Sequence, residues 1–288
     1  MSVLTAADVL VCGGYLLIVI ALGFYFSRKQ TSSEEYFLGG RNMHWFLVGL
    51  SVFAGTFSSL SFVGLPREAA YENYHLYLAI CFIPVVVMPL VGVFFLPLYF
   101  RLKFTSIYEY LEWRFHRSVR LFASMLYIAY TIGWMGNMLV AVGKILQVVL
   151  VLDSNQLRLV LFCVGLFATV YTTLGGVRAV IWTDVIQVIL LIGGGLLTIA
   201  YVAYSTGSWL PDWYETATLY LDSNEQGKKP IALFSMNPMV RSTIVTVALN
   251  MCVWHVCTHI ANQMTVQRYF STSDLAAARR SFVTGSLF

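Results

Sequence analysis

The chain has 288 residues, of which 58% are hydrophobic and only 11% are charged, and its formal net charge is +4. Soluble globular domains carry about 25% charged residues, so this composition leaves too few polar side chains for a water-facing surface and excludes an ordinary soluble domain. The sequence contains no low-complexity run, basic block or nucleic-acid-binding motif. We therefore expect a membrane protein that has no nucleic-acid partner.

A transmembrane helix needs about 20 mostly apolar residues. By this criterion the sequence predicts seven spans, at residues 7–27, 45–65, 76–100, 121–152, 157–174, 179–204 and 240–264. Backbone amides in lipid must be hydrogen-bonded within their own segment, so these spans are expected to be helices. The segment before the first span lacks a basic region and a cleavage site, which indicates a retained span and not a signal peptide. The expected fold class is all-α, a polytopic helical membrane protein.

Lysine and arginine fall mainly in one alternate set of the loops that join these spans. Twelve lie in that set and five in the other; the twelve are Arg28, Lys29, Arg41, Arg101, Lys103, Arg114, Arg117, Arg120, Arg178, Arg268, Arg279 and Arg280. Cytoplasmic loops carry the basic excess, so the N-terminus is predicted to lie outside. Segment 205–241 is then an exposed outer loop, and 106–115 is a short helix at the inner surface. The expected location is the plasma (cell inner) membrane, in contact with the lipid bilayer.

The end of the sequence is unusual. Arg279 and Arg280 resemble the inner flank of an eighth span, yet only residues 281–288 follow them. Eight residues cannot cross a bilayer. We therefore expect the chain to be a fragment or a truncated product.

Two of the predicted spans carry small and polar residues in their middle. In the second span, residues 55–61 (GTFSSLS) place one glycine and four hydroxyl side chains in an apolar stretch. Glycine is a weak helix former, and serine and threonine can bond the backbone, so this run favours local unwinding. The seventh span crowds eight residues that are costly in lipid: Asn250, Trp254, His255, Cys257, Thr258, His259, Asn262 and Gln263. Taken singly, either run is also compatible with close packing of helices.

As a pair, the two runs favour a transporter. Carriers built on inverted repeats place discontinuous helices at corresponding positions of each half, around a site near the bilayer midplane. The second and seventh spans are five helices apart, as two such repeats require. Carbonyls freed at a break can hold a cation, and the N-termini of half-helices can hold an anion.

Residues 171–187 (YTTLGGVRAVIWTDVIQ) form the inner turn after the fifth span. The residues themselves predict a tight turn at Gly175 and Gly176 and a cytoplasmic anchor at Arg178, but an ordinary turn does not explain Asp184 at the membrane edge. The whole string resembles the signature of the sodium/solute symporter family, which includes carriers of proline, sugars, sialic acid, monocarboxylates and iodide. Four further segments match in order, at 37–41 (FLGGR), 64–68 (GLPRE), 106–115 (SIYEYLEWRF) and 267–269 (QRY).

The resemblance implies a LeuT-like fold of two inverted five-helix repeats with one extra helix before them. Residues 1–288 would form a single transmembrane domain. The extra helix would lie at 7–27, the first repeat at about 45–204, the outer loop at 205–241 and the start of a truncated second repeat at 242–288. The implied function is sodium-coupled symport of a small organic solute or anion, with sodium as the coupling ion and no other cofactor.

The resemblance also implies the binding residues. Backbone carbonyls at about Ala54 and Phe57 would hold sodium, with the remaining ligands beyond Phe288, and Asp184 matches a carboxylate near the inner sodium exit. The substrate positions would be Ser58, Ser59, Ser61, Asn262 and Trp254. Sugar carriers have glutamine where Ser61 stands and proline carriers have aspartate where Thr56 stands, which argues against hexose and proline as substrates.

Three further side chains admit two interpretations each. Lys144 is either a lysine that snorkels to the outer interface or a cation that attracts an acidic substrate. His255 and His259 lie four residues apart on one helical face, which suits packing or hydrogen bonding better than a metal site, because no third ligand is nearby. The alternatives to a carrier are a non-transporting fragment or regulatory membrane protein and, less favoured, a metal-dependent membrane enzyme; we expect no catalytic residues.

Overall fold

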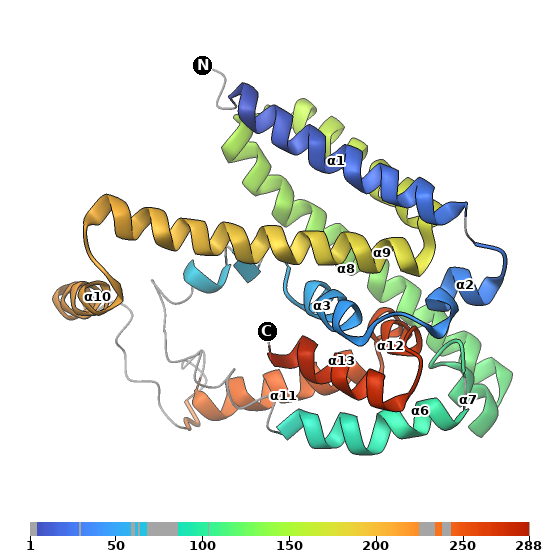
Figure 1. Ribbon diagram of the computed structural model, residues 1–288. Coiled ribbons are helices and arrows are strands. Elements are labelled where there is room, and N and C mark those ends of the chain that lie inside the picture. The colour runs from blue at the N-terminus through green and yellow to red at the C-terminus, as the bar shows by residue number, and fades with distance from the viewer. Residues whose placement is uncertain are drawn as a thin grey trace.

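The computed structural model describes residues 5–28, 30–58, 61–62, 64–67, 86–102, 104–224, 234–237 and 243–287. The described residues are almost entirely helical (Figure 1). They contain no β-strand, and the isolated bridge between Met43 and Thr272 is the one β-type pairing among them. The expected all-α class is confirmed.

The described helices match the predicted spans in part, and residues 76–85 of the third predicted span lie outside the described residues. In the first half the helices are α1 (Ala6–Ser27), α2 (Ser33–Leu38), α3 (Trp45–Thr56), a π-helical stretch at Leu90–Phe95, α6 (Leu96–Leu102) and α7 (Glu109–Arg114). In the second half they are α8 (Arg117–Leu150), α9 (Ser154–Thr206), α10 (Leu210–Asn224), α11 (Ile244–Ile260), α12 (Gln263–Phe270) and α13 (Leu275–Leu287).

Three of the described helices, α1, α8 and α9, are long and apolar enough to cross a membrane, and α11 with α12 would count as a fourth, bent span if the two are taken together. The 53 residues of α9 contain both the fifth and the sixth predicted span. The helix turns sharply at Gly176, so that one arm lies beside α1 and the other runs past α3 (Figure 1). Helices α3 and Val86–Leu102 are shorter apolar helices that match the second and third predictions in part.

The turn at Gly176 requires glycine for two reasons. Its φ of 59° and ψ of −165° lie in a region that is essentially restricted to glycine. A Cβ atom at this position would also lie 2.8 Å from both Gln30 Nε2 and the carbonyl oxygen of Tyr36. The predicted tight turn at Gly175 and Gly176 is therefore confirmed.

Segments that carried the family resemblance meet in space at this turn. Arg178, two residues after Gly176, donates from Nε to the Gly39 carbonyl at 3.0 Å and from Nη2 to Asn42 Oδ1 at 3.0 Å. Gln267 of α12 donates to the Phe37 carbonyl at 2.6 Å. Three of the matched strings, 37–41, 171–187 and 267–269, are therefore structural partners.

Helix α13 packs into the core against α3. A Cβ atom on Gly49 would lie 2.7 Å from Thr284 Cβ, so the two helices cross with almost no space between their backbones. The π-helical stretch has the geometry that lets Arg279 Nε donate to the Gly92 carbonyl at 2.8 Å. Arg279 and Arg280, which we counted among the loop residues, lie inside a helix that begins at Leu275, and their place at the flank of an eighth span stays a prediction.

The outer segment was also predicted incorrectly in part. Residues 210–224, expected to be loop, form α10, which lies apart from the other helices at the left of Figure 1. Pro211 lies in the first turn of α10, where proline is tolerated because the amides of that turn have no helical partner to lose. Asp212 caps the helix by accepting a hydrogen bond from the Trp209 amide at 2.8 Å.

Candidate functional site

The first break follows α3. Thr56 donates from Oγ1 to the carbonyls of Val52 and Phe53, at 3.2 and 2.9 Å, and Phe57 then leaves the helix with φ −97° and ψ 100°. Helical backbone resumes at Ser61. No hydrogen bond between described residues uses the carbonyl oxygen of Ala54 or Phe57. Within the described residues, these two oxygens thus have no hydrogen-bond donor, and their role as sodium ligands stays a prediction.

Two predicted substrate residues face each other across this break. The hydroxyl oxygens of Ser58 and Ser61 lie 3.5 Å apart, and the Ser61 amide lies 3.4 Å from Ser58 Oγ. Ser58 therefore caps the helical segment that follows the break, in the manner of an N-cap serine. Ser59, the third predicted hydroxyl, lies outside the described residues.

The second break separates α11 from α12 with a bend of 53°. Helix α11 ends at Ile260. In its last turn, the carbonyl of Cys257 accepts from the amides of Ala261 and Asn262 at 2.8 and 3.2 Å. Asn262 then caps α12, because its Oδ1 accepts from the amides of Met264 and Thr265 at 3.0 and 3.4 Å. Both spans expected to be broken are broken.

Three tyrosine hydroxyls contact the second break. Tyr99 donates to the Ile260 carbonyl at 2.8 Å and Tyr108 to the Ala261 carbonyl at 3.2 Å, while Tyr127 donates to Asn262 Oδ1 at 3.1 Å. Burial raises the pKa of the Tyr108 phenol above its ordinary value, so that it stays protonated and able to donate. In contrast to the first break, the backbone oxygens here are already bonded.

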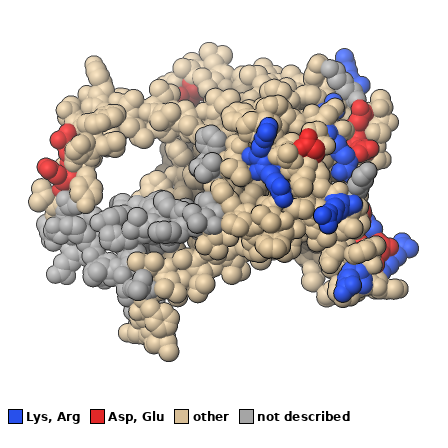
Figure 2. Space-filling view, turned by 60° about the horizontal axis from the view of Figure 1, so that its bottom comes forward, with Lys and Arg blue, Asp and Glu red and all other residues tan. Residues whose placement is uncertain are grey.

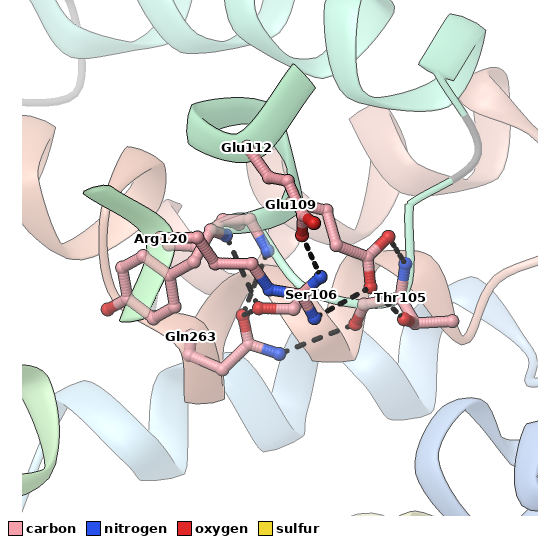
Figure 3. Close-up of polar contacts among 8 residues, drawn as sticks. Thr105, Ser106, Glu109, Glu112, Arg120 and Gln263 are labelled. Atoms are coloured by element: carbon pink, nitrogen blue, oxygen red, sulfur yellow. Dashed lines mark hydrogen bonds and ion pairs between the residues drawn. The ribbon is translucent and has the colours of Figure 1, made fainter. Parts of the chain in front are cut away.

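The residue after Asn262 is held by the loop that precedes α7 (Figure 3). Gln263 accepts at Oε1 from Ser106 Oγ and from the Ile107 amide, at 3.2 and 3.0 Å, and its Nε2 lies 3.4 Å from the Thr105 carbonyl. Glu109 in turn accepts from the Thr105 amide at 3.2 Å. Arg120 of α8 pairs with the carboxylates of this short helix, at 2.6 Å from Glu112 and 3.7 Å from Glu109.

Asp184, predicted to assist sodium, lies in a nearly buried ion pair. Arg268 Nη2 lies 3.0 Å from Asp184 Oδ2, and the two side chains are only 14% and 13% exposed. Ser51 of α3 donates to the same carboxylate oxygen and accepts from Arg268 Nε at 2.7 Å. This triad joins α3, α9 and α12, and each charge compensates the other where water is scarce.

Two further predicted side chains, Lys144 and Trp254, lie on α8 and α11. Lys144 is exposed on α8, and Trp254 of α11 packs its ring against His255, with ring centres 4.9 Å apart. Among the described residues, neither forms a hydrogen bond with Ser58, Ser61 or Asn262. Sequence analysis did not find the roles of Arg268 and Tyr127, although Arg268 stands in the matched string 267–269.

His259 is a buried hydrogen-bonding residue, which is the interpretation that its sequence position favours. Its Nδ1 lies 2.6 Å from Tyr269 Oη, and both side chains are almost fully buried. The ring of His255 stacks on that of His259 at 5.8 Å. Within the described part of the chain, no group of three or more His, Cys, Asp or Glu side chains could hold a metal ion.

These observations define a class: an all-helical membrane protein with two discontinuous spans. The model of the sodium:solute symporter family matches residues 36–288, and the chain belongs to that family. It is 30% identical over 275 residues to the sodium/sialic acid symporter SiaT of Proteus mirabilis. The matched region covers 95% of this chain and 53% of SiaT. The chain is 32% identical over 277 residues to the human sodium-coupled monocarboxylate transporter 1, covering 95% of this chain and 44% of that one.

A solved structure is similar as well. The substrate-bound outward-open state of a Na+-coupled sialic acid symporter superposes with a TM-score of 0.82 at 30% identity, over 95% of this chain and 55% of that one. The LeuT-like fold expected from the resemblance is thus confirmed. The chain spans about half the length of the curated relatives that it matches.

Proposed function

We propose that this protein contributes the first half of the transport path of a sodium-coupled symporter for a small solute that carries an anionic or other hydrogen-bond-accepting group. The observation that carries the proposal is the pair of helix breaks at Phe57–Ser58 and Ala261–Asn262. A continuous helix bonds its own carbonyls, whereas a break in the membrane leaves polar groups available to a ligand.

Sodium would bind at the first break. The carbonyl oxygens of Ala54 and Phe57 have no partner among the described residues, and hard cations of this kind prefer oxygen ligands. Asp184 would assist sodium on the inner side, but its carboxylate is now paired with Arg268. An ion at Asp184 would therefore have to share this carboxylate with Arg268 or displace it.

The solute would lie between the breaks, in contact with Ser58, Ser59, Ser61, Asn262 and Trp254, and Lys144 would attract an acidic group. The hydrogen bonds of Asn262 indicate which chemical groups the solute can carry. Two backbone amides identify which atom of its side chain is the oxygen, since an amide nitrogen cannot accept from them. The NH2 group forms no hydrogen bond among the described residues, and as a donor it suits a carboxylate or hydroxyl oxygen on the solute. The relatives named for sialic acid and monocarboxylates carry solutes with a carboxylate.

The coupling energy is sufficient for concentrative uptake. A tenfold sodium gradient supplies about 1.4 kcal/mol, and a membrane potential of about 100 mV adds about 2.3 kcal/mol per charge. For one sodium ion per neutral solute, the sum corresponds to roughly 500-fold accumulation. No covalent step is needed, and we propose no enzymatic activity.

We further propose that the protein crosses the plasma (cell inner) membrane with its N-terminus outside. The charge distribution supports this orientation. Lys and Arg side chains gather on the right-hand side of the molecule in Figure 2, whereas the projecting left-hand side shows acidic ones. The described acidic residues of that projection include Asp212 and Glu215 of α10. A basic excess on one side of the molecule, with twelve Lys and Arg residues in one set of loops and five in the other, follows the positive-inside rule.

The test is uptake into liposomes that hold the protein expressed from its complete reading frame. Labelled sialic acid, lactate, a hexose and proline are each supplied with a sodium gradient or with choline in its place. The proposal predicts sodium-dependent uptake of sialic acid or lactate and little uptake of hexose or proline. Binding of a solute without any uptake would instead support the regulatory alternative, and uptake that is equal in choline would contradict sodium coupling.

A further inference from the structure

We infer that Tyr99, Tyr108 and Tyr127 are positioning residues of the second break, and that Tyr127 sets the affinity for the solute without touching it. The inference rests on the proposed function, which it deepens. Its basis is a set of three hydroxyl groups from three different segments that contact three consecutive residues, Ile260, Ala261 and Asn262.

The break deprives two backbone carbonyls, those of Ile260 and Ala261, of the amide donors that a continuous helix would supply. In a continuous helix the carbonyls of Ile260 and Ala261 would accept from the amides of Met264 and Thr265. Here both amides turn to Asn262 Oδ1, so the two carbonyls lose their helical partners. A carbonyl left unbonded away from water costs several kcal/mol in a membrane. Tyr99 and Tyr108 supply the missing donors, which explains why phenols reach this point.

The three tyrosines belong to a part of the chain far from the break in sequence. Tyr99 lies on α6, Tyr108 directly before α7 and Tyr127 on α8, and the rings of Tyr108 and Tyr127 are 5.6 Å apart. The bonds formed by Tyr99 and Tyr127 link residues 161 and 135 positions apart. The contacts of Gln263 with Ser106 and Ile107 strengthen the same junction (Figure 3). The first half of the protein therefore shapes the second break.

The two breaks would then offer different groups to ligands, backbone carbonyls to sodium at the first and a side chain to the solute at the second. The carbonyls of Ala54 and Phe57 at the first break have no donor among the described residues, while those of Ile260 and Ala261 at the second accept from tyrosine hydroxyls. The second break therefore offers the solute a donor chiefly through a side chain, the amide NH2 of Asn262. Tyr127 fixes the opposite end of that amide by donating to its oxygen at 3.1 Å. Without the hydroxyl, the Asn262 oxygen would be held only by the amides of Met264 and Thr265, at 3.0 and 3.4 Å. The NH2 group would then be less firmly oriented, and solute affinity would fall.

Tyrosine-to-phenylalanine variants remove each hydroxyl and keep the ring. Tyr130→Phe is the matched control, because Tyr130 lies three residues further along α8, is 56% exposed and forms no hydrogen bond among the described residues. The first readout is the maleimide labelling rate of a Thr265→Cys reporter in protein whose five native cysteines are replaced by serine. Thr265 is buried in the first turn of α12, so its labelling requires the junction to open.

We expect Tyr99→Phe and Tyr108→Phe to raise the labelling rate about fivefold, the change that corresponds to one lost hydrogen bond of about 1 kcal/mol. Tyr127→Phe should raise the half-saturating concentration of sialic acid or lactate by a similar factor, with the half-saturating sodium concentration at saturating solute unchanged. Tyr130→Phe should match the parent in both assays. Parent-like behaviour of all three variants, or an equal effect of Tyr130→Phe, would overturn the inference.

The labelling assay separates this inference from the proposed function, because it requires neither sodium nor solute. Faster labelling in Tyr99→Phe or Tyr108→Phe, together with no uptake by the parent, would support the positioning role while the symport proposal fails. Uptake by the parent together with unchanged labelling and solute affinity in the variants would leave symport standing and reject the positioning role. Tyr108 is only half-buried, so its variant provides a result even where Tyr99→Phe fails to fold.

Discussion

The guanidinium of Arg268 lies 3.0 Å from the carboxylate of Asp184, across the boundary between α12 and the second arm of α9. This ion pair borders the first break, since a Cβ atom on Gly55 would lie 3.6 Å from Arg268 Nη1. The pair therefore connects the segment that follows the second break to the residues that form the first. Movement of α12 and a change at the sodium site are expected to be coupled through it.

Replacing Arg268 by glutamine should destabilise the protein strongly. Removal of the cation leaves Asp184 as a nearly buried charge without its partner, which typically costs about 3–5 kcal/mol. The midpoint of thermal unfolding in detergent measures the effect. The double variant Arg268→Gln with Asp184→Asn should recover much of the loss, because no charge is then left uncompensated.

Arg41→Gln is the control for this prediction. Arg41 pairs with Glu34 at 2.7 Å, but its side chain is 28% exposed and that of Glu34 is 57% exposed. Exposed pairs contribute about 0–1 kcal/mol, so the unfolding midpoint should change little. If the Arg268→Gln protein were as stable as the Arg41→Gln protein, the ion pair between Arg268 and Asp184 would have no structural role.

Gly176→Ala should impair folding. The backbone conformation at this residue is nearly exclusive to glycine and costs other residues about 1–3 kcal/mol, and the new methyl group would clash with Gln30 and Tyr36. Gly193→Ala in the same helix is the control, because a Cβ atom there has nothing within 4 Å. The yield of monodisperse protein from size-exclusion chromatography measures both; equal yields would argue against a fixed turn at Gly176.

Two substitutions of Asn262 distinguish its roles. Aspartate caps a helix as well as asparagine does, so Asn262→Asp should keep α12 intact while losing the NH2 donor and gaining a charge that repels an anionic solute. Asn262→Ala loses the cap as well, at about 1 kcal/mol. We expect both variants to lose solute affinity and only the alanine variant to lose thermal stability. Retained affinity in Asn262→Asp would remove Asn262 from the solute site.

Tyr269→Phe should reduce stability by about 1–3 kcal/mol, because it leaves the buried Nδ1 of His259 without its hydrogen-bond partner. This bond spans the second break, from α11 to α12. Tyr201→Phe, on an exposed part of α9, should be neutral. Comparison of the two unfolding midpoints tests the prediction, and equal midpoints would mean that the bond contributes nothing to the bend.

The sequence predicted those features that depend on local composition. Four hydroxyls around Gly55 and the polar run that ends at Gln263 violate the pattern of an apolar span, so both breaks were predictable. The paired glycines at 175 and 176 likewise indicated the turn. The helix α10 was missed because its acidic residues and Pro211 have loop-like chemistry, although the same residues suit the first turn of a helix.

The contacts of the site were beyond sequence analysis. Nothing in the local sequence around Tyr127 indicates that its hydroxyl meets Asn262, because the two residues are 135 positions apart. The string 267–269 was recognised without a role, yet its three side chains bind three different elements: Phe37 of α2, Asp184 of α9 and His259 of α11. Such pairings depend on tertiary packing and require a structure.

The most direct test of the whole account is the dissociation constant of sialic acid or lactate, measured at equilibrium in choline and again over a series of sodium concentrations. If both ligands bind at the paired breaks, sodium should tighten solute binding about 5- to 150-fold, the usual range of coupling between sites. The solute should tighten sodium binding by the same factor. A dissociation constant that does not change with sodium would contradict the account.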